Sequence, residues 1–174
     1  MINLLFGGPI LLTAKLIVDE LKKLKITHVV GLPDNGSAAV YEILQNDSDI
    51  DLISVCREGE AFAIAAGLYV GGKRPVVLIQ CTGFFESGDA IRGTVVNAKI
   101  PLVALIGYRG YHKMSRPDKW VDTAATFFEP TLKAWNITYY IMETDDDIKY
   151  IAEAFKQAEA TSMPAATLIV GMCE

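Results

Sequence analysis

REGEAFAIAAGLYVGGKRPVVLIQCTG, residues 57–83, joins the two patterns that decide the fold of this chain. Residues 59–70 are rich in alanine, so a helix there can lie close to its neighbours. A glycine pair follows, and residues 75–81 are then almost continuously Val, Leu and Ile. Such an apolar run is typical of a strand that is covered on both faces. The stretch therefore predicts a helix that leads into a buried strand.

The same alternation extends over the whole chain. Five further apolar runs have the length of strands: 26–32, 51–56, 101–107, 137–142 and 165–170. Between them, residues 10–25 place apolar side chains on one helical stripe, and Thr144 with Asp147 resembles a capping box that begins another helix. This order predicts an α/β fold: a single three-layer domain over 1–174, with a mostly parallel six-stranded sheet and helices on both faces.

Composition and charge narrow the class of protein. The 174 residues are 51% hydrophobic and 21% charged, with a formal net charge of -5, which is typical of a packed globular protein and does not favour nucleic-acid binding. Cys56, Cys81 and Cys173 are far apart, which argues against a disulfide framework or a zinc site and fits the reducing cytoplasm. The first twelve residues lack a basic region and a cleavage site, so no signal peptide is expected. No stretch reaches the ~18 apolar residues of a membrane span.

The residues that follow each strand are the candidates for function, because parallel sheets bind ligands beyond the carboxyl ends of their strands. Pro33, Asp34 and Asn35 follow the first strand, although Asn35 or Ser37 could simply cap the next helix. Glu58 follows the second strand, where its side chain could reach over the edge of the sheet. Glu60 fits the ordinary preference of acidic residues for helix N-termini.

Two further strand ends carry unusual residues. After the third strand, 80–89 combine small and hydroxylated residues that could cradle a ligand, or could be a helix start capped by Ser87, and they match no phosphate-loop motif. After the fourth strand, Arg109, His112 and Lys113 begin a locally basic segment. This segment is either a solvated loop or one that attracts an anionic substrate.

Taken together, these segments resemble the pyrimidine-binding domain of thiamine-diphosphate enzymes. The similarity is greatest to the alpha subunit of sulfopyruvate decarboxylase and the N-terminal domain of phosphonopyruvate decarboxylase. It is carried by Arg57-Glu58 before a helix of small residues, by AGLYVGGKRP at 66–75 and by Gln80 at the strand end. The flanking VGLPD at 30–34 and LIGYRG at 105–110 are also similar.

The resemblance implies a catalytic role for Glu58. The equivalent glutamate hydrogen-bonds N1′ of the cofactor's aminopyrimidine and favours its imino tautomer, and the cofactor then attacks a small 2-oxo acid and accepts the electrons left when CO2 departs. We expect further cofactor contacts from residues at the same strand ends: Pro33, Gln80, Cys81, Thr82 and Phe85. The tentative substrate contacts are Asp34, Asn35, Arg109, His112 and Lys113. His112 is a candidate proton donor, with a plain surface histidine as the alternative.

The resemblance also implies a partner. Such enzymes bind the diphosphate through Mg2+ held by a GDG motif, and no GDG occurs in these 174 residues. The chain itself is therefore expected to hold no metal, and a separate beta subunit should supply the Mg2+ site. On this view the chain is one subunit of a carboxy-lyase and is inactive alone. Phe84, Phe85 and Tyr108 are expected to line an apolar cleft, through which the isolated chain would form a homo-oligomer.

The loop after the third strand departs from the pattern of the close relatives. Phe85 stands in place of a glycine and Glu86 in place of an amide. If Glu86 faces the site, its charge should disfavour a strongly anionic substrate. Two other functions stay open: a carboligase of the acetolactate-synthase type, and a non-catalytic domain that retains the fold.

Overall fold

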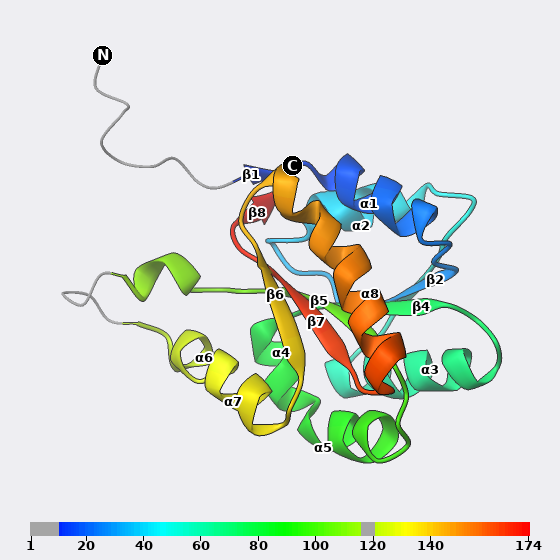
Figure 1. The fold of residues 1–174 in the computed structure, drawn as a ribbon. Coiled ribbons are helices and arrows are strands. Elements are labelled where there is room, and N and C mark those ends of the chain that lie inside the picture. The colour runs from blue at the N-terminus through cyan, green and yellow to red at the C-terminus, as the bar shows by residue number, and fades with distance from the viewer. Residues whose placement is uncertain (1–10, 116–120) are drawn as a thin grey trace.

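The computed structural model describes residues 11–115 and 121–174, and its centre is one parallel sheet. The six strands have the order β3-β2-β4-β5-β7-β6, and every neighbouring pair is parallel (Figure 1). All six predicted strands are confirmed, as is the predicted fold class. In chain order the strands are β2 His28–Gly31, β3 Asp51–Ser54, β4 Pro75–Gln80, β5 Val103–Gly107, β6 Thr138–Met142 and β7 Ala165–Ile169.

A second, two-stranded sheet was not predicted. It pairs β1 (Leu11–Leu12) in parallel with β8 (Met172–Cys173), so the beginning of the described chain lies beside its end (Figure 1). Two-residue strands are too short to show any periodicity in the sequence.

Strand β4 shows why the sheet needs a helical layer on each side. Val76 and Leu78 belong to one buried cluster, and Val77 and Ile79 belong to the other. Because successive side chains of a strand point to opposite faces, a continuous apolar run must be covered twice. The run of four apolar residues therefore determines a three-layer arrangement.

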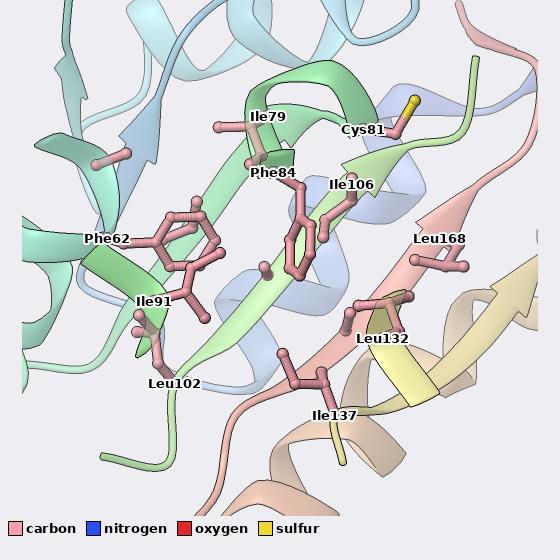
Figure 2. Close-up of a cluster of buried hydrophobic side chains, with 14 of the residues drawn as sticks. Phe62, Ile79, Cys81, Phe84, Ile91, Leu102, Ile106, Leu132, Ile137 and Leu168 are labelled. Atoms are coloured by element: carbon pink, nitrogen blue, oxygen red, sulfur yellow. The ribbon is translucent and has the colours of Figure 1, made fainter. Parts of the chain in front are cut away.

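The helices divide between these two clusters. In the cluster that contains Val76 and Leu78, one face of the sheet packs against α1 (Ala14–Lys23), α2 (Ala38–Gln45) and α8 (Lys149–Thr161). The other face is covered by the remaining long helix, α3 (Glu58–Val70), and by shorter ones (Figures 1 and 2). These are α4 Cys81–Glu86, α5 Gly88–Ala90, the π-helix η1 Ile91–Val96, α6 Thr123–Thr126 and α7 Phe128–Ala134. In the part of the chain that the structure describes, no helix combines the length and apolarity that crossing a membrane requires.

Two predicted helix starts have different outcomes. The capping box of Thr144 and Asp147 is confirmed, and it begins the 3-10 helix η3 (Asp145–Ile148) that leads into α8. Ser87 does stand at the N-cap position of α5, but its side chain makes no cap hydrogen bond, because its hydroxyl donates to the carbonyl of Gly83 at 2.7 Å. The predicted loop is instead the helix α4, which begins directly after β4. The glycine and aromatic content of this segment concealed its helical character.

Candidate functional site

The candidate site lies at the carboxyl edge of the sheet, where the ends of three central strands meet. Gln80 of β4 pairs with Gly107 of β5, and Gly107 pairs with Ile169 of β7. Helix α4 continues from β4 without a loop and is anchored by Phe84, whose ring lies 5.3 Å from that of Phe128 and 5.5 Å from that of Trp135. Burial of this ring stabilises the fold by roughly 1.5–3 kcal/mol and fixes α4 in place.

Glu58 is the first residue of α3, and its side chain lies against α4. A Cβ placed on Gly83 would lie 2.4 Å from Cγ of Glu58 and 2.5 Å from its Oε1, so the carboxyl fills the space that a side chain at position 83 would need. The neighbouring carboxylates are occupied: Glu60 accepts from the backbone N–H of Cys56, and Glu86 from that of Gly59. Glu58, by contrast, has no hydrogen-bond or ion-pair partner among the described residues. Packing against Gly83 restrains the Glu58 carboxyl, and both of its oxygens can still form hydrogen bonds with a ligand.

Asp34 lies at the same edge, in the turn after β2. Its Oδ1 accepts from the backbone N–H of Gly36 at 2.6 Å, and its Oδ2 accepts from the hydroxyl of Ser37 at 2.8 Å. Ser37 stands at the predicted N-cap position of α2, but its side chain makes no cap hydrogen bond, because its hydroxyl turns back to Asp34. A Cβ on Gly107 would lie 3.7 Å from Asp34, so this carboxylate lies over the end of β5.

Tyr41 of α2 has a buried hydroxyl whose pKa depends on both Asp34 and Glu58. The hydroxyl of Tyr41 donates to the carbonyl of Leu78 at 2.7 Å. Burial first, and then the negative charges of Asp34 and Glu58, raise the pKa of Tyr41 far above its usual range. The Tyr41 hydroxyl therefore stays protonated and keeps its hydrogen bond to the backbone of β4.

A cavity of about 390 Å³ opens beside Asp34. It is lined by all five predicted substrate contacts and one predicted cofactor contact: Asp34, Asn35, Arg109, His112, Lys113 and Gln80. Tyr111 and Met172 also line it, and our sequence analysis did not identify them. Met172 follows the strand at 165–169, so extending the strand-end argument to the last strand would have found it.

The charges around the cavity are partly compensated. The guanidinium of Arg109 donates to Asp122, and the hydrogen bond from the Ala124 backbone N–H, followed by Arg109, lowers the pKa of Asp122. His112 is exposed and contacts the ring of Tyr111 edge to face, with 5.4 Å between centroids. Among the described residues, Lys113 is therefore the cavity-lining cation that makes no ion pair.

The other predicted cofactor contacts are scattered. Cys81 is fully buried, and its thiol points to the carbonyl of Arg109, so its side chain offers no surface to a ligand, contrary to our expectation. Burial raises the pKa of this thiol. Thr82 and Phe85 line a separate shallow hollow with Phe127. Pro33 is exposed and lines neither hollow.

The expected open apolar cleft is also corrected. Phe84 and Tyr108 are 2% and 3% exposed, because both rings pack into the core against Phe128. The exposed apolar side chains near this edge include Phe85 and Phe127, which line one hollow, and Met172, which lines the cavity. Glu86 does not face the cavity, because its carboxylate binds Arg57 and the backbone of Gly59. Its charge therefore gives no reason to exclude an anionic substrate.

The Glu58 carboxyl has the chemistry to hydrogen-bond a ring nitrogen of an aminopyrimidine. It occupies the space above Gly83 and does not itself line the cavity beside Asp34. Within 11–115 and 121–174, no three His, Cys, Asp or Glu side chains lie close enough together to hold a metal ion.

The sequence matches a family model over residues 12–125, described as the N-terminal TPP binding domain of thiamine pyrophosphate enzymes. The alpha subunit of sulfopyruvate decarboxylase from Methanocaldococcus jannaschii is 30% identical over 123 residues, which is 67% of this chain and 73% of that protein. Acetolactate synthase from Bacillus subtilis is 32% identical over 147 residues, 83% of this chain and 24% of that enzyme.

Among solved structures, benzoylformate decarboxylase from Polynucleobacter necessarius superposes with a TM-score of 0.72 at 20% identity. The match covers 90% of this chain and 29% of that one, and it shows that the fold is shared. The family model covers about two thirds of the sequence, including Glu58, Gly83 and the ends of β2, β3, β4 and β5. The chain therefore belongs to the thiamine pyrophosphate enzyme family and carries its N-terminal TPP binding domain.

Proposed function

We propose that this chain is the alpha subunit of a two-subunit, thiamine-diphosphate-dependent 2-oxo acid decarboxylase, in which Glu58 contacts N1′ of the aminopyrimidine. The observation that carries the proposal is the Glu58 carboxyl, which has no polar partner in the described structure and is seated on Gly83 beside the strand ends. A carboxyl without a polar partner can exchange a proton with a ring nitrogen that is bound within hydrogen-bond distance of it. The fold and the family membership support the same assignment.

Thiamine diphosphate, when bound, would supply the electron sink for loss of CO2 from a 2-oxo acid. The chain's own residues would orient the cofactor and the substrate and would exchange protons with them. Glu58 would exchange a proton with the ring nitrogen, and its place in the first turn of α3 directs its carboxyl to Gly83. The hydroxyl of Thr82 donates to the side-chain oxygen of Gln80 at 3.0 Å. This contact holds the Gln80 amide at the edge of the cavity.

The 390 Å³ cavity is the proposed substrate side of the site. Lys113 would attract the carboxylate of a 2-oxo acid, and His112, which lines the same cavity, would return a proton to the product. Asp34, with both oxygens hydrogen-bonded, is a fixed acceptor facing the same space. Asn35 and Arg109 complete the polar lining.

A second polypeptide is part of the proposal. The sequence contains no GDG motif, and the described residues contain no cluster of metal ligands, so Mg2+ and the diphosphate would be held by a beta subunit. The similarity to a protein named as an alpha subunit supports this division. We further propose that the assembly works in the cytoplasm and that the isolated chain pairs with itself through the exposed Phe85 and Phe127.

A carboligase is the second candidate, because acetolactate synthase is 32% identical over 83% of this chain. Both reactions need the same contact from Glu58 and differ in what the cavity admits after CO2 leaves. Product analysis separates them: an aldehyde indicates decarboxylation, and a 2-hydroxy-2-acyl acid indicates ligation.

Reconstitution tests the proposed function. The purified chain alone should release no CO2 from sulfopyruvate, phosphonopyruvate or other 2-oxo acids. Mixing it with a partner that carries GDG should give release that depends on both thiamine diphosphate and Mg2+. A panel of 2-oxo acids that differ in the distal group then defines the substrate. Full activity of the chain without a partner would contradict the two-subunit assignment, and no activity with any GDG-bearing partner would contradict the enzyme assignment.

Gly83→Ala should move Glu58 without unfolding the protein. The added methyl group would lie 2.4–2.6 Å from side-chain atoms of Glu58, which are flexible and can swing away. We expect a loss of about tenfold or more in kcat/KM of the reconstituted enzyme, since a misplacement of about 1 Å is costly for catalysis. Urea unfolding should change little. Unchanged kinetics would show that the position of Glu58 on Gly83 has no importance.

A further inference from the structure

The residue before Glu58 is a cation that does not pair with it. Arg57 directly precedes α3, and its guanidinium is turned to Glu86 at the end of α4. Both Nε and Nη2 of Arg57 donate to Oε1 of Glu86, at 2.9 Å and 2.5 Å. This two-point contact fixes the plane of the guanidinium as well as its position.

The same carboxylate also binds the residue after Glu58. Oε2 of Glu86 accepts from the backbone N–H of Gly59 at 2.8 Å. This hydrogen bond, and then Arg57, lower the pKa of the Glu86 carboxyl, which favours its ionised form. Glu86 thus holds both chain neighbours of Glu58, while the Glu58 side chain itself lies against Gly83, three residues earlier on α4.

The alternative arrangement would harm the proposed site. The negative charge of Glu58 already acts on Arg57, although less than that of Glu86. With Glu86 neutral, the carboxylates whose charges still act on the guanidinium would be those of Glu60 and then Glu58. An arginine paired with Glu58 would hold it in the charged form and would occupy the oxygens that a ring nitrogen needs.

We propose that Glu86 is a positioning residue that holds the guanidinium of Arg57 away from Glu58 and so keeps the Glu58 carboxyl unpaired. The catalytic importance of an unpaired Glu58 rests on the proposed function. The arrangement of Arg57, Glu58 and Glu86 is observed independently of that function. This assignment also gives a physical reason for the glutamate that our sequence analysis noted as a departure from the related decarboxylases.

A titration of Glu58 in the isolated chain tests this proposal without cofactor or partner. The charged and titratable groups in the surroundings of Glu58 are Arg57 and Glu60 on the same chain segment, Glu86 from α4, and Asp34 with Tyr41 from the β2–α2 segment. The side-chain carboxyl carbon of Glu58 can be followed by carbon-13 NMR, with Glu58→Gln to assign its signal. Glu86→Gln is the main variant, because an amide oxygen can still accept from Gly59 while the ion pair with Arg57 is lost.

We expect Glu86→Gln to move the Glu58 titration to lower pH when Arg57 is present, and by clearly less in the Arg57→Gln background. Asp89→Asn is the matched control, because it removes an equal charge from the next helix without touching Arg57, and it should leave the titration nearly unchanged. Glu86→Ala serves as a second variant and should give a shift in the same direction. Each variant is checked for folding by circular dichroism.

Equal shifts with and without Arg57 would overturn the proposal, because Glu86 would then act only through its own charge. The absence of any shift in Glu86→Gln and Glu86→Ala would overturn it as well. The proposed function is tested separately: if thiamine diphosphate never binds, the titration still reports whether Glu86 restrains Arg57. Conversely, a refuted role for Glu86 would leave the assignment of Glu58 intact.

Discussion

Glu58→Gln should lower CO2 release by the reconstituted enzyme about 10²–10⁴-fold, the usual range for loss of a positioned acid–base group. Glutamine has nearly the same shape and can still fill the space above Gly83, but it cannot exchange a proton with a ring nitrogen. Because the Glu58 carboxyl makes no hydrogen bond among the described residues, the substitution should cost little stability. The measurement is kcat with saturating cofactor and substrate.

Glu60→Gln is the matched control for this variant. Glu60 is a carboxylate on the same turn of α3, and it accepts only from the backbone N–H of Cys56 in the described structure. Its amide can keep that bond, so activity should stay within about twofold of the parent, as expected for a surface substitution. If both variants lost activity equally, the effect would belong to the charge of this helix end and not to Glu58.

Gly31→Ala should destabilise the fold by about 3 kcal/mol or more. Gly31 ends β2 between two strands, and a Cβ there would lie 1.8 Å from the carbonyl oxygen of Leu78 and 2.5 Å from the hydroxyl of Tyr41. The first obstacle is backbone and cannot swing away. Relief of the overlap must therefore separate β2 from β4 or break the hydrogen bond from Tyr41 to Leu78. Urea unfolding of the isolated chain measures the change.

Gly67→Ala gives the comparison within the same protein. Gly67 lies within α3, and a Cβ at this position would meet nothing within 4 Å. Alanine inside a helix is favoured over glycine by roughly 0.5–1 kcal/mol, so this variant should be neutral or slightly more stable. A Gly31→Ala protein as stable as Gly67→Ala would show that the β2–β4 contact is looser than the structure indicates.

The fold was predictable because its signals are local. Each central strand is a continuous apolar run that only a sheet covered on both faces explains, as the alternation of Val76 to Ile79 between the two clusters shows. Helix α4 was missed because two phenylalanines next to a glycine do not form a helical stripe. Its burial depends on Phe128 and Trp135, more than forty residues later, so no local pattern reveals it.

The candidate site was predictable in part. The argument from strand ends correctly brought Asp34, Gln80 and Arg109 to one cavity, since the carboxyl ends of parallel strands meet at one edge. It could not show that Arg109 binds Asp122, or that Glu86 turns to Arg57, because side-chain pairing depends on distances that the sequence does not contain. The direction of Cys81 into the core was missed for the same reason.

The distance from the Glu58 carboxyl to N1′ of bound thiamine diphosphate tests the central claim most directly. A crystal structure of the reconstituted complex with cofactor and Mg2+ provides it. We predict one carboxyl oxygen at hydrogen-bond distance from N1′, about 2.6–3.2 Å, with the metal held by the partner. A pyrimidine ring bound away from the edge formed by Glu58 and Gly83, or a Glu58 carboxyl paired to Arg57 while the ring is present, would contradict the account.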